Sequence, residues 1–168
     1  HLAEILLGMT GLQTVERSDT ISLAALTEEV FCDLDPVAEK HQVRLIQTDG
    51  DCTVTGSYIL LYRAVYNLVE NAIKYNRPSG SVTVSIHSAE SAVLEVTDTG
   101  IGISPENQEK IFDPFYRVDK SRSRAMGGAG LGLALVSEIA RQHNGQVKVT
   151  QSSEKGSTIA LMLPVTLL

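Results

Sequence analysis

The sequence predicts a two-layer α/β sandwich, in which helices cover a sheet of strands, and three observations support this prediction. Segments with apolar residues at helical spacing alternate with segments of strand character, in an order typical of this architecture. The length of 168 residues is sufficient for one domain and a short appendage. The composition, with 43% hydrophobic and 20% charged residues, is that of a soluble globular chain.

The first part of the chain is expected to contain two helices and a strand. Apolar residues recur at three- and four-residue spacing over residues 2–12, which indicates the end of an amphipathic helix. Ser22 is a suitable N-cap for a second helix, which we expect Pro36 to kink or end. Residues 43–47 alternate like a strand, and residues 49–56 are rich in turn formers.

The rest of the chain is expected to alternate helices with pairs of strands. In order, the elements are a helix over about 57–75, strands over 81–88 and 92–97, a short helix near 105–111, a long polar loop over 113–126, a helix that ends near 143, and strands over 147–151 and 158–163.

The helix over 57–75 has an unusual polar face. Asn67 and Asn71 lie one turn apart in its middle, although Asn is a poor helix former. Together with Glu70 and Lys74 they could supply an oxygen ligand for Mg²⁺ and an ammonium group for phosphates, as Mg²⁺–nucleotide sites require. A solvated polar face is the other interpretation.

Asp98 follows directly after a predicted strand and is flanked by Gly100 and Gly102. A carboxylate beside glycines, which allow close backbone approach, can accept a hydrogen bond from an exocyclic amine such as that of adenine. A plain turn capped by Asp98 is the alternative. The Asp-Thr-Gly triplet also occurs in aspartic proteases, but their fold is all-β and this chain is rich in helix.

Glycines at positions 127, 128, 130 and 132 precede a helix, so that backbone N–H groups and the helix terminus could bind phosphates. No Lys-Ser or Lys-Thr pair follows them, which excludes a P-loop. Four basic residues lie just upstream and could attract a polyphosphate, or could form an exposed basic loop: Arg117, Lys120, Arg122 and Arg124.

Composition excludes several other classes of protein. The net charge of −6 and the pI near 5.2 argue against a nucleic-acid partner. Cys32 and Cys52 have neither paired spacing nor nearby histidines, so neither a disulfide framework nor a zinc site is expected. No apolar run reaches the length of roughly 18 residues that a membrane span needs.

Four motifs in this order resemble the catalytic and ATP-binding domain of sensor histidine kinases, in the superfamily of DNA gyrase, mismatch-repair proteins and heat-shock chaperone ATPases. They are NLVENAIKYN at 67–76 (asparagine box), DTGIGI at 98–103 (first glycine box), FDPFYRVD at 112–119 (phenylalanine box) and GGAGLGLALV at 127–136 (second glycine box). The resemblance implies a Bergerat-type ATP-binding fold, with a mixed sheet packed on three helices and a flexible ATP lid.

The resemblance also implies roles for individual residues. The implied catalytic residues are Asn71, Lys74 and Arg117. Asn71, assisted by Asn67, would hold Mg²⁺, while Lys74 and Arg117 would approach the phosphates. Asp98 would bind the adenine amine. The other implied nucleotide-binding residues are Tyr75, Gly100, Gly102, Ile103, Tyr116, Gly128, Gly130, Leu131, Gly132, Leu133 and Ser157.

The implied activity is transfer of the γ-phosphoryl group of Mg²⁺-ATP to a histidine. Asn67 stands where gyrase-like ATPases have a water-activating Glu, and an amide cannot act as a base, so autonomous hydrolysis should be slow unless Glu70 substitutes. The acceptor motif of the family is missing, since none of the four histidines is in its sequence context. We therefore expect no autophosphorylation of this chain alone.

These implications give a domain assignment and a set of partners. Residues 1–16 are expected to end a dimerisation helix, 17–21 to form a linker, and 22–168 to form the catalytic and ATP-binding domain. The expected partners are the dimerisation and phosphoacceptor domain of the same protein, a response regulator, and a second copy in a homodimeric parent. The domain would be cytoplasmic in a membrane-anchored sensor. The alternative function is a nucleotide-gated partner-binding module or an anti-sigma-type serine kinase.

Overall fold

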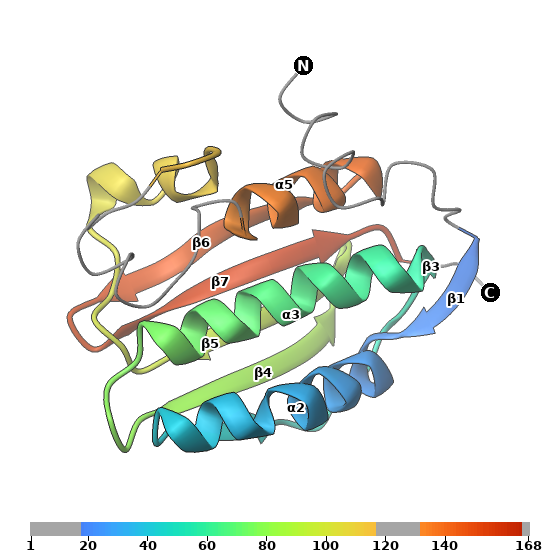
Figure 1. The fold of residues 1–168 in the computed structure, drawn as a ribbon. Coiled ribbons are helices and arrows are strands. Elements are labelled where there is room, and N and C mark those ends of the chain that lie inside the picture. The colour runs from blue at the N-terminus through green and yellow to red at the C-terminus, as the bar shows by residue number, and fades with distance from the viewer. Residues whose placement is uncertain (1–17, 117–131, 166–168) are drawn as a thin grey trace.

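A five-stranded mixed sheet forms one layer of the protein, and three helices cover one of its faces (Figure 1). This computed structural model describes residues 18–116 and 132–165. The strands, in their order across the sheet, are β2 (Arg44–Gln47), β4 (Ser81–Ser88), β5 (Ala92–Asp98), β7 (Gly156–Leu163) and β6 (Gln146–Ser153). Strands β2 and β4 are parallel and the other neighbours antiparallel, which confirms the predicted α/β sandwich with a mixed sheet.

The three helices are α2 (Leu23–Lys40), α3 (Tyr58–Lys74) and α5 (Gly132–Gln142). Serine side chains start the first two, because Ser22 Oγ accepts a hydrogen bond from Ala25 N and Ser57 Oγ accepts one from Leu60 N, each at 3.2 Å. Helix α2 continues past Pro36 to Lys40, so the proline does not end it. Pro36 has no N–H to donate, so the helix lacks one backbone hydrogen bond there. Pro36 lies on the exposed face of the helix.

The core lies between the helices and the inward side chains of the sheet. The apolar stripe of α3 is buried, and so are alternate residues of β4 and β5. The largest completely buried side chains of the described residues include Leu26, Leu34, Leu60, Leu68, Ile73, Leu94, Ile139 and Leu161.

The structure has a small second sheet that the sequence did not predict. Strand β1 (Asp19–Ser22) pairs antiparallel with β3 (Thr53–Gly56), so most of the expected linker and the end of the expected turn segment are strands. Four-residue strands show too little alternation to be recognised, and these two are far apart in the sequence. Their sheet lies at the amino end of α3 (Figure 1), where Asp19 Oδ2 accepts a hydrogen bond from Tyr58 N at 3.0 Å.

The remaining differences are local. The short helix expected near 105–111 is two 3-10 turns, η1 (Pro105–Asn107) and η2 (Lys110–Phe112). Helix α5 ends at Gln142, as expected, and the chain turns there because Asn144 has a φ of 59° and Gly145 N donates to Ala140 O at 2.8 Å. Within the described ranges, no helix is both long and apolar enough to cross a membrane.

Candidate functional site

One face of α3 carries the polar residues that the sequence singled out. Asn67, Asn71 and Lys74 are spaced by four and three residues, so they form one row on the helix, and each is partly exposed. Asn67 Nδ2 donates to Gly132 O, the first residue of α5, at 3.3 Å. Lys74 Nζ lies 3.6 Å from Glu70 Oε1, so this carboxylate pairs with the ammonium group.

Asp98 ends strand β5 and its carboxylate is held in one orientation by three hydrogen bonds. Gly100 N and Ser157 N donate to Oδ1 at 2.9 and 3.2 Å, and Ser157 Oγ donates to Oδ2 at 3.0 Å. Ser157, on the neighbouring strand β7, is only 6% exposed. The carboxylate is therefore an oriented acceptor at the ends of two central strands.

Burial raises the pKa of Asp98 above its ordinary value, although the hydrogen bonds from Gly100 and Ser157 oppose this shift by stabilising the charged form. The group is thus partly desolvated. A donor that approaches Oδ2 meets an acceptor with less competition from water, which strengthens the interaction.

Gly100 joins Asp98 to the end of α3. A Cβ atom on Gly100 would lie 2.4 Å from Tyr75 O and 3.1 Å from the Cα of Asn76, so only glycine fits between this turn and the helix. This contact brings the carboxyl end of α3, with Lys74 and Tyr75, next to Asp98. The structure therefore collects the asparagine box and the first glycine box into one region.

Gly102 and Ile103 continue this turn against the sheet. Gly102 has a φ of +77°, and a Cβ there would lie 2.0 Å from Ser153 O, so its packing against β6 already requires glycine. Ile103 N donates to Ser152 Oγ at 2.7 Å, and the Ile103 side chain packs against the core.

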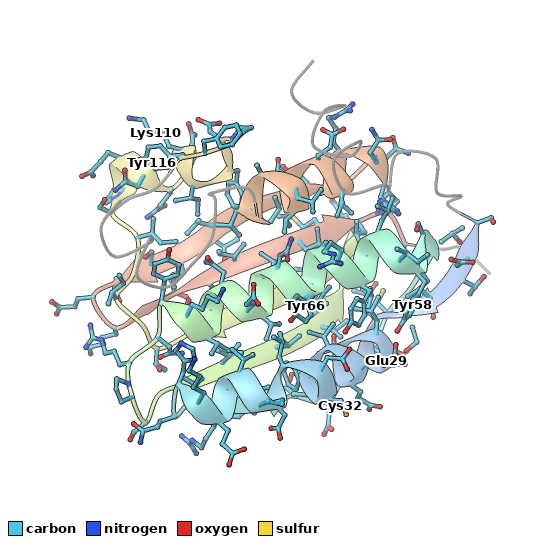
Figure 2. The ribbon with its side chains drawn as sticks, viewed as in Figure 1. Glu29, Cys32, Tyr58, Tyr66, Lys110 and Tyr116 are labelled. Carbon is cyan, nitrogen blue, oxygen red and sulfur yellow. The ribbon has the colours of Figure 1, made fainter. Side chains whose placement is uncertain are left out.

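Tyr116 lies with Lys110 in the segment of the two 3-10 turns, away from the face of α3 that Tyr58 and Tyr66 occupy (Figure 2). Its hydroxyl donates to Asn107 Oδ1, and its ring packs against the core. The hydroxyl is thus engaged within its own segment. Leu133, in the first turn of α5, is also partly buried against the core.

Four of the predicted site residues lie outside the described residues: Arg117, Gly128, Gly130 and Leu131.

The sequence interpretation assigned no role to two polar residues that are central to this region. Asn76, after the end of α3, is 9% exposed, and its side chain contacts Thr99, the residue after Asp98. Both belong to motifs quoted above, but their importance depends on a contact across the fold. An Asn that follows a helix and precedes a turn usually acts locally, which hides such a role.

The donor set on α3 suits Mg²⁺ only in combination with a ligand. Asn71 makes no side-chain hydrogen bond to another described residue, so its amide oxygen can coordinate a cation. In the described part of the chain, no group of three or more His, Cys, Asp or Glu residues could hold a metal. Mg²⁺ that is bound with nucleotides takes few protein ligands and several phosphate and water oxygens, and one amide oxygen on α3 fits that requirement.

Comparison with known proteins identifies what this arrangement resembles. Residues 56–167 match the family model described as histidine kinase-, DNA gyrase B-, and HSP90-like ATPase. That range contains α3, Asp98 and Ser157, so the matched region includes every described site residue.

Relatives and solved structures agree with the match. The sensor histidine kinase RppB of Synechocystis is 44% identical over 141 residues, which cover 83% of this chain and 31% of RppB. The mycobacterial sensor histidine kinase MprB has a TM-score of 0.74 at 27% identity, over 90% of this chain and 99% of that structure. The histidine kinase ThkA, solved in complex with the response regulator TrrA, has a TM-score of 0.76 at 21% identity, over 98% of this chain and 47% of that structure. The chain spans less than half the length of the curated relatives it matches first.

Proposed function

Because the chain belongs to the histidine kinase-, DNA gyrase B- and HSP90-like ATPase family, whose members bind ATP, we propose that it is the kinase core of a two-component sensor histidine kinase. The observation that carries the proposal is the oriented carboxylate of Asp98, held by Ser157 and Gly100 next to the end of the helix that bears Asn71 and Lys74.

The two ends of this region suit the two ends of ATP. Asp98 and Ser157 form an adenine end, where Asp98 accepts a hydrogen bond from the exocyclic amine. Asn71 and Lys74 form a phosphate end, where the amide oxygen of Asn71 would hold Mg²⁺ and the ammonium of Lys74 would approach the phosphates. Bound Mg²⁺ neutralises charge on the phosphates, and phosphoryl transfer depends mainly on such positioning and charge stabilisation.

The phosphoryl acceptor in this proposal is a histidine elsewhere in the parent protein. None of the described histidines is in the family's acceptor context: His41 Nδ1 bonds to Val37 O at 2.9 Å, His143 is 7% exposed, and His87 is an exposed residue of β4. We propose that residues 1–16 end the dimerisation helix of a homodimeric, membrane-anchored sensor, whose acceptor domain takes the phosphoryl group from this cytoplasmic domain. The next acceptor would be a response regulator, the kind of protein with which ThkA was solved.

Asn67 supports transfer over hydrolysis. Its amide group donates to Gly132 O and cannot deprotonate water, and the nearby carboxylate of Glu70 is paired with Lys74. The residues of this face therefore bind and orient, and provide no evident base for attack by water.

The test has two steps. Calorimetric titration of ATP into this chain, with Mg²⁺ and then with a chelator, should show binding that is stronger with the metal. The ATP-loaded chain is then mixed with a purified dimer of sensor acceptor helices, and an acid-labile phosphoryl bond should form there. Absence of ATP binding under both conditions would refute the proposal, and an acid-stable phosphoserine on a partner would favour the serine-kinase alternative.

A further inference from the structure

A set of side-chain hydrogen bonds links the end of α3 to the turn that carries Asp98. Thr99 Oγ1 donates to Asn76 Oδ1 at 2.9 Å and accepts a hydrogen bond from Ser81 N at 2.9 Å. Asn76 Nδ2 donates to Ser81 O at 2.8 Å. The side chains of Asn76 and Thr99 thus hold each other and the first residue of β4, and we refer to the three residues as the clamp.

The clamp is tightly packed. Asn76 Oδ1 also accepts a hydrogen bond from Arg77 N at 2.8 Å, so its amide uses both its oxygen and its nitrogen. A Cβ on Gly80 would lie 2.3 Å from Asn76 Oδ1 and 2.5 Å from Thr99 Oγ1, which leaves no space for another side chain. Satisfied networks of this kind rigidify the segments that they join.

The clamp lies between the two halves of the proposed nucleotide site. On one side, Asn76 follows Lys74, the last residue of α3, and Tyr75, its C-cap. On the other side, Thr99 is covalently joined to both Asp98 and Gly100, whose N–H orients the Asp98 carboxylate. Because Gly100 packs directly on Tyr75 O, movement of Thr99 would shift both this contact and the direction of the carboxylate.

We propose that Asn76 and Thr99 are positioning residues that set the preference of the site for adenine, because they fix the Asp98 turn against the end of α3. This inference rests on the proposed ATP site. Neither residue needs to touch the nucleotide. Their effect passes through the angle at which Asp98 meets the base amine, and hydrogen bonds weaken steeply as that angle departs from linear.

The chain supplies a matched control for Thr99. Thr97 lies two residues earlier, and its Oγ1 is 2.9 Å from Thr158 Oγ1. Side chains alternate along a strand, so Thr97 is on the face of β5 opposite to that of Asp98. Because its hydroxyl bonds to Thr158, it is outside the clamp. The substitutions Thr97→Val and Thr99→Val therefore remove the same hydroxyl group from two exposed threonines, each hydrogen-bonded, at different places.

The experiment compares the affinities for Mg²⁺-ATP and Mg²⁺-GTP by calorimetric titration of the whole chain. We expect Thr99→Val to reduce the ATP-over-GTP preference by about fivefold or more, equivalent to about 1 kcal/mol. Thr99→Ser, which keeps the hydroxyl, and Thr97→Val should retain the preference of the unmodified chain. The stoichiometry of binding reports the fraction of competent molecules, so a loss of folded protein is read separately from a change in preference.

A second variant keeps the test decisive if Thr99→Val does not fold. Asn76→Ser removes both amide contacts of the clamp, and we expect it to lower the preference in the same direction. An unchanged preference in either folded variant would overturn the inference, and so would an equal fall in Thr97→Val. If the unmodified chain binds no ATP, the proposed function fails as well, whereas ATP binding with an unchanged preference refutes only the role of the clamp.

Discussion

Substitution of Asp98 by Asn tests the adenine end directly, because the new side chain has the same shape and no charge. Asn can still accept hydrogen bonds from Gly100 N and Ser157 N through its oxygen, and its NH₂ group would then face Ser157 Oγ in place of the second carboxylate oxygen. The fold should therefore be preserved. What is lost is the acceptor that the base amine requires.

The expected effect on binding follows from the type of hydrogen bond removed. A hydrogen bond to a charged group contributes about 1.5–3 kcal/mol, which corresponds to roughly a 10- to 150-fold loss of ATP affinity. GTP, which presents a carbonyl at the equivalent position of its base, should lose far less. Titration of both nucleotides in the presence of Mg²⁺ measures the two changes.

Asp98→Asn should lower the affinity for ATP but not the stability of the fold. Burial raises the pKa of Asp98 in the folded protein, so the charged form costs stability at neutral pH, and this cost disappears as the pH falls through the folded pKa. The Asn variant avoids that cost. Its free energy of unfolding at pH 7 should equal or exceed that of the unmodified chain, and the difference should shrink as the pH is lowered.

Urea denaturation across a pH series measures this, with Asp35→Asn on the exposed face of α2 as a control that removes one carboxylate elsewhere. An Asp98→Asn variant that binds ATP as tightly as the unmodified chain would refute the role of Asp98. A variant that loses affinity and stability together would show that the carboxylate is structural.

Three further substitutions test other parts of the structure. Asn71→Ala should lower the affinity for Mg²⁺-ATP more than that for ATP with a chelator, and equal losses in the two titrations would contradict the metal role. His143→Ala removes the acceptor of Ser57 N, which lies 3.0 Å from His143 Nε2, and should lower the free energy of unfolding by about 1–3 kcal/mol. An unchanged midpoint of urea denaturation would contradict this role of His143. Gly100→Ala places a Cβ 2.4 Å from Tyr75 O and should cost about 1–3 kcal/mol, together with nucleotide affinity. If Gly100→Ala had the stability and the nucleotide affinity of the unmodified chain, the turn at Gly100 could shift freely.

Local patterns determine much of this fold, which is why they could be read from the sequence. The apolar stripe of α3 is encoded within one segment, the Ser22 cap lies directly before α2, and the glycines beside Asp98 follow it within four residues. The pairing of β1 with β3 depends on residues far apart in the chain, and no periodicity within four residues reveals it.

The candidate site divides in the same way. Asn71 stands out because Asn is unusual in the middle of a helix, and Asp98 because a strand precedes it and two glycines follow it within four residues. Asn76 and Thr99 do not, since a polar residue near a turn is ordinary. Their contact emerges only when α3 and β5 are side by side, which is a property of the packed sheet rather than of either motif.

The small β1–β3 sheet has a mechanical consequence. Asp19 pairs with Gly56, which immediately precedes the Ser57 cap of α3, and Asp19 also accepts a hydrogen bond from Tyr58 N. The carboxyl end of α3 is held as well, because Asn76 bonds to Thr99 and Ser81 and the Gly100 turn packs on Tyr75. A helix of 17 residues is about 25 Å long and stiff. Helix α3 therefore acts as a strut that fixes the separation between the β1–β3 sheet and the Asp98 turn.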